Sequence, residues 1–238
     1  MPKCGSGINA TLNDLLNQVM MVKSMHDDIK TCGRFNIHYA RMGEPTWNTA
    51  VLDSAILLKY ELSGFLVHPV VSTMMPRKNE NLARFIWAWC HIKNEYYNGE
   101  AGLQLSINST NDKERIAMFS GNALDLVSIS KIMRTMPKPV GRKYTLNFAI
   151  AGYEIDAEYL ARLFDPRDFI CKLTPMHKTA SALKNGIETN GDYTESYPYE
   201  EYESTLKDVG FDVLTFIASK EEDDSRITCG NAILADRE

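Results

Sequence analysis

The first residues with a chemical signature lie where a predicted strand ends. Gly43, Glu44 and Pro45 form a turn in which the glycine allows the backbone to approach a ligand closely. Glu44 then offers a carboxylate, which suits recognition of an ammonium group. The same turn can also start a helix, with Glu44 at its positive end. The motif alone therefore leaves a binding site and a helix entry open.

Hydroxyl and amide side chains follow the next two predicted strands. Ser72 and Thr73 end one strand, and Ser106 and Asn108 follow the other. These groups suit a ribose or an amino-acid carboxylate, although each one alone could cap a helix. Functional groups of βα barrels sit just after the carboxyl ends of the strands. Their shared position at successive strand ends favours a binding site.

Histidine and cysteine add further candidates for chemistry. His177 follows a later strand and could donate a hydrogen bond or a proton, although a single histidine is more often structural. The five cysteines are widely and irregularly spaced, at Cys4, Cys32, Cys90, Cys171 and Cys229. An odd number with this spacing argues against a disulfide framework and for reduced thiols.

Strands alternate with helices along the chain that must position these residues. Strands are predicted over residues 35–40, 65–71, 103–107, 144–150, 169–173 and 212–217. Helices are predicted over 11–26, 48–62, 79–97, 156–164 and 199–209, with further helical segments near 112–136. Thr11 and Asp14 resemble a capping box at the start of the first helix. The order predicts parallel βα units, in a closed or partial barrel or in an open doubly wound sheet.

Length and composition fit one domain. A chain of 238 residues, 44% of them hydrophobic, supplies one sizeable core. We expect a single domain over residues 1–238, in which residues 199–238 form a C-terminal segment of helix, strand and Cys229. The polar stretch 178–198 is longer than an ordinary connection, and a functional lid and a tolerated insertion are equally compatible with it.

Charge gives no general sign of nucleic-acid binding. The formal net charge is −5 and the pI is about 5.6, so any contact with RNA must be local. Local candidates are Arg77, Lys78, Lys138, Arg142 and Lys143, for which surface solubility is the simpler explanation. The amino terminus has no secretion signal, and no window reaches the length of a membrane span. We therefore expect a cytoplasmic protein that does not bind to a membrane.

Seven short segments match one known family in the same order along the chain. They are CGSG at 4–7, RMGEPTWN at 41–48, VST at 71–73, LSINSTNDKER at 105–115, LTPMH at 173–177, GF at 210–211 and DDSRITCGN at 223–231. This series resembles the RlmN/Cfr group of radical S-adenosylmethionine (SAM) RNA methyltransferases. The resemblance covers nearly the whole chain. It implies an α/β fold, a partial (β/α)6 TIM-like radical SAM barrel.

The resemblance implies cofactor-binding roles for five residues of these segments. Cys4 matches one ligand of a 4Fe-4S cluster, and Glu44 matches the residue that binds the amino group of SAM. Ser72 and Ser106 match positions near the ribose or carboxylate of SAM. His177 stands where the family has an Asn that faces the adenosine.

The family also implies the reaction and its partners. Cys229 matches the cysteine that takes a methyl group from SAM, after which a radical derived from a second SAM activates that methyl for addition to adenine. The substrate would be adenosine in structured RNA, either rRNA or tRNA, and an electron donor such as flavodoxin is implied. His177, Thr228 and Asn231 differ from the family pattern and leave the substrate open.

The cluster motif is incomplete. The usual Cys-x3-Cys-x2-Cys spacing puts the middle ligand at Met1 and the first one before the chain, while Cys32, Cys90 and Cys171 lack the local spacing to replace them. We therefore expect a barrel without its first strand and first two cluster cysteines, as in a truncated sequence. A radical SAM enzyme of different reaction or substrate, or a cluster-free barrel without catalysis, remains an alternative.

Overall fold

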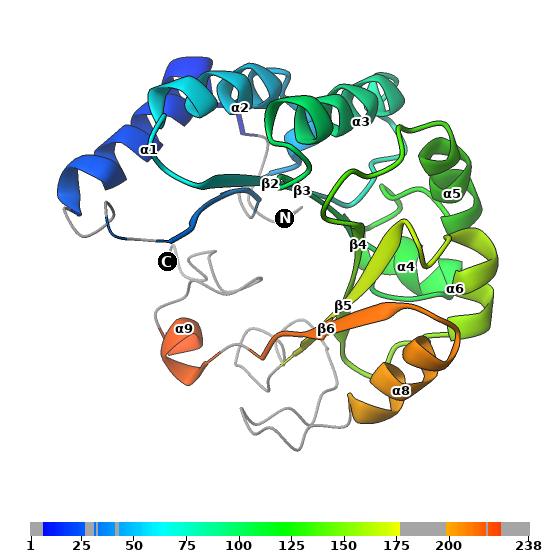
Figure 1. The fold of residues 1–238 in the computed structure, drawn as a ribbon. Helices are drawn as coiled ribbons and strands as arrows, with labels where there is room; N and C mark the ends of the chain where they lie inside the picture. Colours follow the sequence, from blue (N-terminus) through cyan, green and yellow to red (C-terminus); the bar gives the residue numbers. More distant parts are fainter. Residues whose placement is uncertain are drawn as a thin grey trace, which may run out of the picture.

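Six parallel strands form one curved sheet in the computed structural model, which describes residues 7–26, 31, 33–40, 43–176, 199–217 and 219–224. The strands follow chain order across the sheet: β1 (Phe35–Tyr39), β2 (Val67–Thr73), β3 (Gly102–Ser106), β4 (Tyr144–Ile150), β5 (Phe169–Pro175) and β6 (Asp212–Thr215). Every neighbouring pair is parallel. Among the described residues β1 and β6 do not pair, so the sheet is open (Figure 1). The predicted α/β fold with a partial, TIM-like arrangement is confirmed.

The described part of the chain also has ten helical segments, most of which follow the outside of the sheet (Figure 1). They are α1 (Leu12–Met25), η3 (Pro45–Trp47), α2 (Ala50–Glu61), α3 (Leu82–His91), η4 (Ile92–Tyr96), α4 (Asp112–Met118), α5 (Leu126–Arg134), α6 (Ala157–Leu163), α8 (Glu200–Asp208) and α9 (Lys220–Asp224). None of these helices combines the length and the apolar character that crossing a bilayer requires.

Helix α1 begins at the predicted capping box. The backbone N–H of Asp14 donates to the Thr11 hydroxyl at 3.2 Å, and the backbone N–H of Thr11 donates to the Asp14 carboxylate at 2.8 Å. Each residue thus satisfies a backbone donor that the first helical turn leaves without an intrahelical partner.

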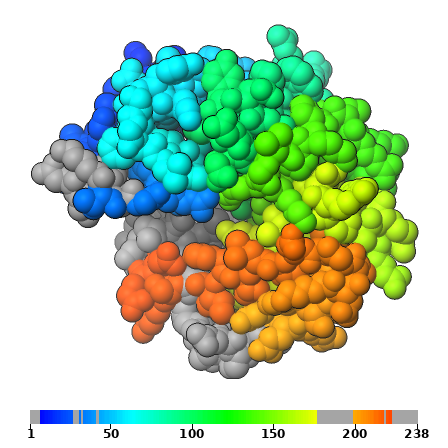
Figure 2. Space-filling model, viewed as in Figure 1, coloured from blue at the N-terminus to red at the C-terminus, as the bar shows by residue number. Residues whose placement is uncertain are grey.

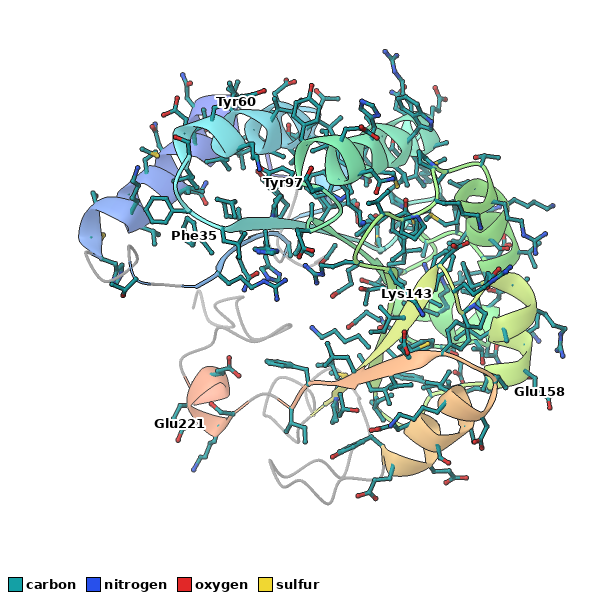
Figure 3. All side chains as sticks on the ribbon, viewed as in Figure 1. Phe35, Tyr60, Tyr97, Lys143, Glu158 and Glu221 are labelled. Atoms are coloured by element: carbon teal, nitrogen blue, oxygen red, sulfur yellow. The ribbon has the colours of Figure 1, made fainter. Side chains whose placement is uncertain are left out.

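The core lies between the outer face of the sheet and the helices. In β4, Tyr144, Leu146, Phe148 and Ile150 are buried, and the residues between them are only half-buried. Successive side chains of a strand point to opposite faces, so one face of the sheet packs on the helices and the other lines the concave side. Tyr97, labelled in Figure 3, ties the end of η4 to α2 by donating its hydroxyl to the carbonyl of Ala55 at 2.5 Å.

Some boundaries of the predicted elements differ from those in the structure. Strand β2 starts at Val67, because Phe65 lies in a turn in which Gly64 has a φ of 117° and the Phe65 N–H donates to Leu62. The helix predicted over 79–97 becomes π-helical in η4. The helical segments predicted near 112–136 are found as two helices, and the turn between them contains Ser120 and Gly121, which both have positive φ.

Lys93 is a charged residue buried under the sheet. Its side chain has no exposed surface, and Nζ donates to the Val140 carbonyl at 2.5 Å and lies 5.8 Å from the ring centre of Tyr144. Burial lowers the pKa of Lys93 from 10.5 to about 8. Between these two pH values the unfolded chain still binds the proton that the folded chain has released. Lys93 therefore makes the protein less stable at neutral pH, and this penalty disappears as the pH rises from about 8 to about 10.5.

Lys93→Met is expected to remove this dependence of stability on pH. The free energy of unfolding of the variant, relative to the wild type, should fall by about 2 kcal/mol between pH 7 and pH 10. Urea unfolding at the two pH values measures this change. Lys131→Met, at an exposed position on α5, is the control and should show no such change. If the free energy of unfolding depends on pH equally in the wild type and in Lys93→Met, the result would contradict the lowered pKa of Lys93.

Candidate active site

The Glu44 carboxylate joins the loops after β1 and β2. Oε1 accepts hydrogen bonds from the Thr46 backbone N–H at 3.2 Å and from the Thr46 hydroxyl at 2.7 Å. Oε2 accepts one from the backbone N–H of Met74 at 2.9 Å, directly after β2. Glu44 is also the N-cap of η3, with Pro45 as its first residue. The helix-entry interpretation of the turn is therefore correct, and it coexists with a long-range contact to the next strand.

Buried neighbours hold Glu44 in place. Thr46 is almost fully buried, and the Asn79 side chain donates to its carbonyl at 2.8 Å. Gly43 has a φ of 122°, a left-handed conformation that favours glycine. A carboxylate can accept about four hydrogen bonds, so the three that Glu44 accepts from the protein leave capacity for another donor.

A pocket of about 250 Å³ lies beside this turn. Its lining includes Gly43, Glu44, His38 and Asn48, together with Asn9 from the segment before α1. The Asn9 side chain donates to the Trp47 carbonyl at 3.1 Å, and the Asn48 side chain donates to the Ala10 carbonyl at 2.8 Å. The segment that follows Cys4 in the sequence is thus fixed against Trp47 and Asn48, which follow the Gly43–Pro45 turn.

Ser72 and Ser106 both lie on the concave face. Each is half-buried, near the end of its strand. Ser72 pairs with Gln104, which is two residues before Ser106 on β3. Ser106 pairs with Asn147 and therefore lies two residues closer to the carboxyl edge than Ser72. The structure brings both hydroxyls to the carboxyl edge, as the sequence predicts, and their role in binding stays a prediction.

Asn108 has a structural role at the same edge. Its φ is 65°, its backbone N–H donates to the Asn147 carbonyl at 3.1 Å, and its Oδ1 accepts from the Ala149 N–H at 3.1 Å. These contacts extend the pairing of β3 and β4 beyond Ser106. The carbonyl of the Asn108 side chain is committed to the sheet.

Arg115 holds the loops after β2 and β3 together. It is fully buried on α4, where Nη2 donates to the Met74 carbonyl at 2.7 Å and Nη1 donates to the carbonyls of Ser106 and Ile107, the latter at 2.8 Å. Nε donates to Leu124 at 2.9 Å. Burial lowers the pKa of Arg115 to about 10, so the guanidinium remains charged at neutral pH. Arg115 is a positioning residue for the strand ends that carry the predicted site.

The predicted residues Cys4, His177 and Cys229 lie outside the described residues, as does the polar stretch 178–198. Within the described part of the chain, no group of three or more His, Cys, Asp or Glu side chains could hold a metal ion. Cys90 and Cys171 are buried, and burial raises the pKa of the Cys90 thiol to about 11 and that of Cys171 further still. Both thiols are therefore protonated at neutral pH, which makes them poor nucleophiles and metal ligands.

Polar residues in the middle of β4 and β5 were missed by the sequence analysis, which considered only the strand ends. Asn147, Lys172 and Thr174 are half-buried on the concave face. Register places Ser106, Asn147 and Lys172 at one level across three adjacent strands. The signal was present in the sequence, since each of these residues interrupts an apolar strand at alternate positions. Figure 2 shows the blue atoms of β1 and the orange atoms of β6 apart from each other, at the two ends of the open sheet.

Comparison with known proteins identifies the fold. No model of a protein family matches the sequence, and no curated protein matches it. A radical SAM methyltransferase from Sphaerobacter thermophilus matches with a TM-score of 0.67 and 19% identity, over 96% of this chain and 63% of that one. SuiB from Streptococcus suis, bound to S-adenosylmethionine, matches with a TM-score of 0.52 and 12% identity, over 91% and 45% of the two chains. SuiB bound to the precursor peptide SuiA matches with a TM-score of 0.53 and 11% identity, over 89% of this chain and 43% of that one.

These structures show that the chain has the fold of the radical SAM enzymes. The open six-stranded sheet corresponds to a partial radical SAM barrel, as predicted. The chain spans less than two thirds of the length of the solved proteins that it matches.

Proposed function

We propose that this chain belongs to a radical SAM enzyme that methylates adenosine in structured RNA, as RlmN/Cfr-type enzymes do. The observation that carries the SAM part of this proposal is the position of Glu44. Its carboxylate is fixed by Thr46 and Met74 at the carboxyl edge of the sheet, borders a pocket and retains capacity for another donor. A fixed carboxylate of this kind suits the amino group of SAM.

The neighbouring groups fit the rest of a SAM molecule. Ser72 and Ser106 supply hydroxyls on the adjacent strands, and such groups bind a ribose or a carboxylate. His177 is proposed to contact the adenosine. Gly43 completes this set by allowing the backbone of the turn to lie close to a ligand.

Cys4 is proposed as one ligand of a 4Fe-4S cluster. The hydrogen bonds of Asn9 and Ala10 to the loop that contains Glu44 support this, because they bring the segment after Cys4 to the side of the predicted SAM site. When bound, such a cluster supplies the electron that cleaves SAM and starts radical chemistry. We propose that an electron donor such as flavodoxin provides that electron, and that Cys229 carries the methyl group to RNA.

Glu44→Gln tests the SAM site. The change keeps the size of the side chain and removes the charge that would attract the amino group, and a charge-assisted hydrogen bond of this kind is worth about 10- to 100-fold in affinity. We expect a fall of that size in the affinity of the full-length, cluster-loaded protein for SAM, measured by anaerobic calorimetry.

The control for this experiment is Glu61→Gln, which removes an exposed carboxylate at the end of α2 and should leave SAM affinity unchanged. Equal affinity of Glu44→Gln and the wild type would show that Glu44 only caps η3. The thermal unfolding temperature of each variant separates lost binding from lost structure.

A further inference from the structure

A cavity of about 460 Å³ lies at the amino-terminal edge of the sheet, between the neighbouring helices α5 and α6 (Figure 1). Its lining includes Tyr144 and Phe169, the first residues of β4 and β5. The Glu44 carboxylate and its pocket lie at the opposite, carboxyl edge. Sites for small molecules usually have volumes of about 300–1000 Å³. The cavity is therefore separate from the proposed SAM site and large enough for a small ligand.

Apolar side chains form much of the wall of this cavity. Three of them are prolines, whose rings restrict the backbone: Pro137, Pro139 and Pro166. Met133 and Met136 add thioether side chains, which adapt to irregular or aromatic surfaces. The wall therefore suits an apolar or aromatic group.

Backbone carbonyls in the lining already accept hydrogen bonds from the protein. The Ser130 hydroxyl donates to the Leu163 carbonyl at 2.7 Å, and the Tyr144 hydroxyl donates to the Pro137 carbonyl at 2.6 Å. These contacts reduce the need for a ligand that brings its own donors.

The two carboxylates of the lining are both paired with cations. Asp168 forms an ion pair with Lys138, which also lines the cavity. Asp165 accepts from Nε of Arg167 at 3.0 Å and from Nη2 at 2.6 Å, in a bidentate pair. Each of these two pairs is neutral as a whole.

The guanidinium groups of Arg134 and Arg162 give the lining an excess of positive charge. Nη2 of Arg134 donates to the Arg162 carbonyl at 3.4 Å. Arg162 lies over the Tyr159 ring, and its Nη1 is 3.9 Å from Oε2 of Glu158, which is labelled in Figure 3. Both side chains of this ion pair are largely exposed, so it contributes little. A guanidinium carries five N–H donors in a planar fork that matches carboxylate and phosphate oxygens, so both arginines keep donors for a ligand.

We propose that this cavity binds a small organic anion, whose apolar or aromatic body packs on the prolines and methionines and whose carboxylate or phosphate group binds Arg134 and Arg162. The inference goes beyond the proposed function and does not depend on it, because the proposed SAM site shares no residue with this cavity. A carboxylic acid and a phosphate ester are the two sources of such a group.

Calorimetric titration of the full-length protein with two anions and their neutral counterparts tests the proposal. Benzoate and benzamide test for a carboxylate, while adenosine monophosphate and adenosine test for a phosphate. We expect one of the two anions to bind saturably, about tenfold or more tightly than its neutral counterpart. Arg134→Gln and Arg162→Gln should each weaken this binding about tenfold. Arg84→Gln, at an exposed position on α3, is the control and should bind the anion as the wild type does.

Ala161→Phe tests the cavity without changing its charge. Ala161 is half-buried on α6 and lines the cavity, so a phenyl ring at this position should fill part of the space and weaken binding of the anion about tenfold or more. Ala117→Phe, at an exposed position on α4, is the matched control and should bind normally. The thermal unfolding temperature of each variant separates lost binding from lost structure.

The choice of anion identifies the source of the anionic group, since preference for benzoate indicates a carboxylic acid and preference for adenosine monophosphate indicates a phosphate ester. The proposal is wrong if neither anion binds to the wild type, or if the neutral counterparts bind as tightly as the anions. It is also wrong if the two arginine variants or Ala161→Phe retain the affinity of the wild type. Arg134 and Arg162 would then only stabilise the carboxyl-terminal ends of their helices.

Discussion

Replacing Arg115 with Met is expected to lower the free energy of unfolding by about 3–5 kcal/mol. The guanidinium donates to four backbone carbonyls, those of Met74, Ser106, Ile107 and Leu124. Met fills a similar volume but leaves these buried acceptors without their donor. Each unsatisfied buried acceptor costs about 1–3 kcal/mol before relaxation. Urea unfolding of the wild type and the variant measures the loss.

Arg115→Lys separates charge from geometry. Lysine keeps the positive charge, but its single nitrogen cannot reach carbonyls from the ends of two strands and a loop at the same time. We expect the free energy of unfolding to fall by less than in Arg115→Met but by more than about 1 kcal/mol, because about two of the hydrogen bonds should be lost. Arg134→Met, at an exposed position on α5, is the control, with an expected change within about 0.5 kcal/mol. An Arg115→Met protein as stable as the wild type would contradict this role.

The order of strands and helices could be predicted from the sequence because each element carries its own local pattern. The alternation of β4 and the capping box of Thr11 and Asp14 depend only on neighbouring residues, and both are found as predicted. The start of β2 could not be predicted, since it depends on the turn at Gly64 and on the register of β2 beside β1.

The candidate site was only partly predictable for a similar reason. The sequence placed Glu44, Ser72 and Ser106 at successive strand ends, and the structure brings them to one edge of the sheet. The contact of Glu44 with Met74 joins residues 30 positions apart, so no local pattern reveals it. The sequence predicts a ligand-binding amide at Asn108, but it does not reveal that the oxygen of this amide accepts a hydrogen bond from Ala149 in the next strand.

Replacing Cys229 with Ala is expected to abolish methyl transfer to RNA. In the proposed reaction the Cys229 thiolate is the nucleophile that accepts the methyl group from SAM. Alanine has no atom that could accept it, whereas binding and reductive cleavage of SAM do not require this thiol. The variant should therefore still cleave SAM while forming no methylated adenosine. Mass spectrometry of nucleosides from digested RNA, after incubation with SAM and a reductant, measures the methylation.

The Cys32→Ala variant is the control for losing a cysteine without an assigned role, and it should methylate RNA as the wild type does. Methylated adenosine formed by Cys229→Ala would contradict a methyl-carrying cysteine. If the wild type cleaves SAM but leaves RNA unmodified, the result would favour a radical SAM enzyme with a different substrate.

Cluster binding and reductive cleavage of SAM by the wild-type protein give the most direct test of the proposed function. The full-length protein, reconstituted anaerobically with iron and sulfide and then reduced, is expected to hold a 4Fe-4S cluster and to convert SAM to 5′-deoxyadenosine and methionine. A protein that retains no iron or sulfide and leaves SAM intact under these conditions would contradict the proposed chemistry and leave only the fold.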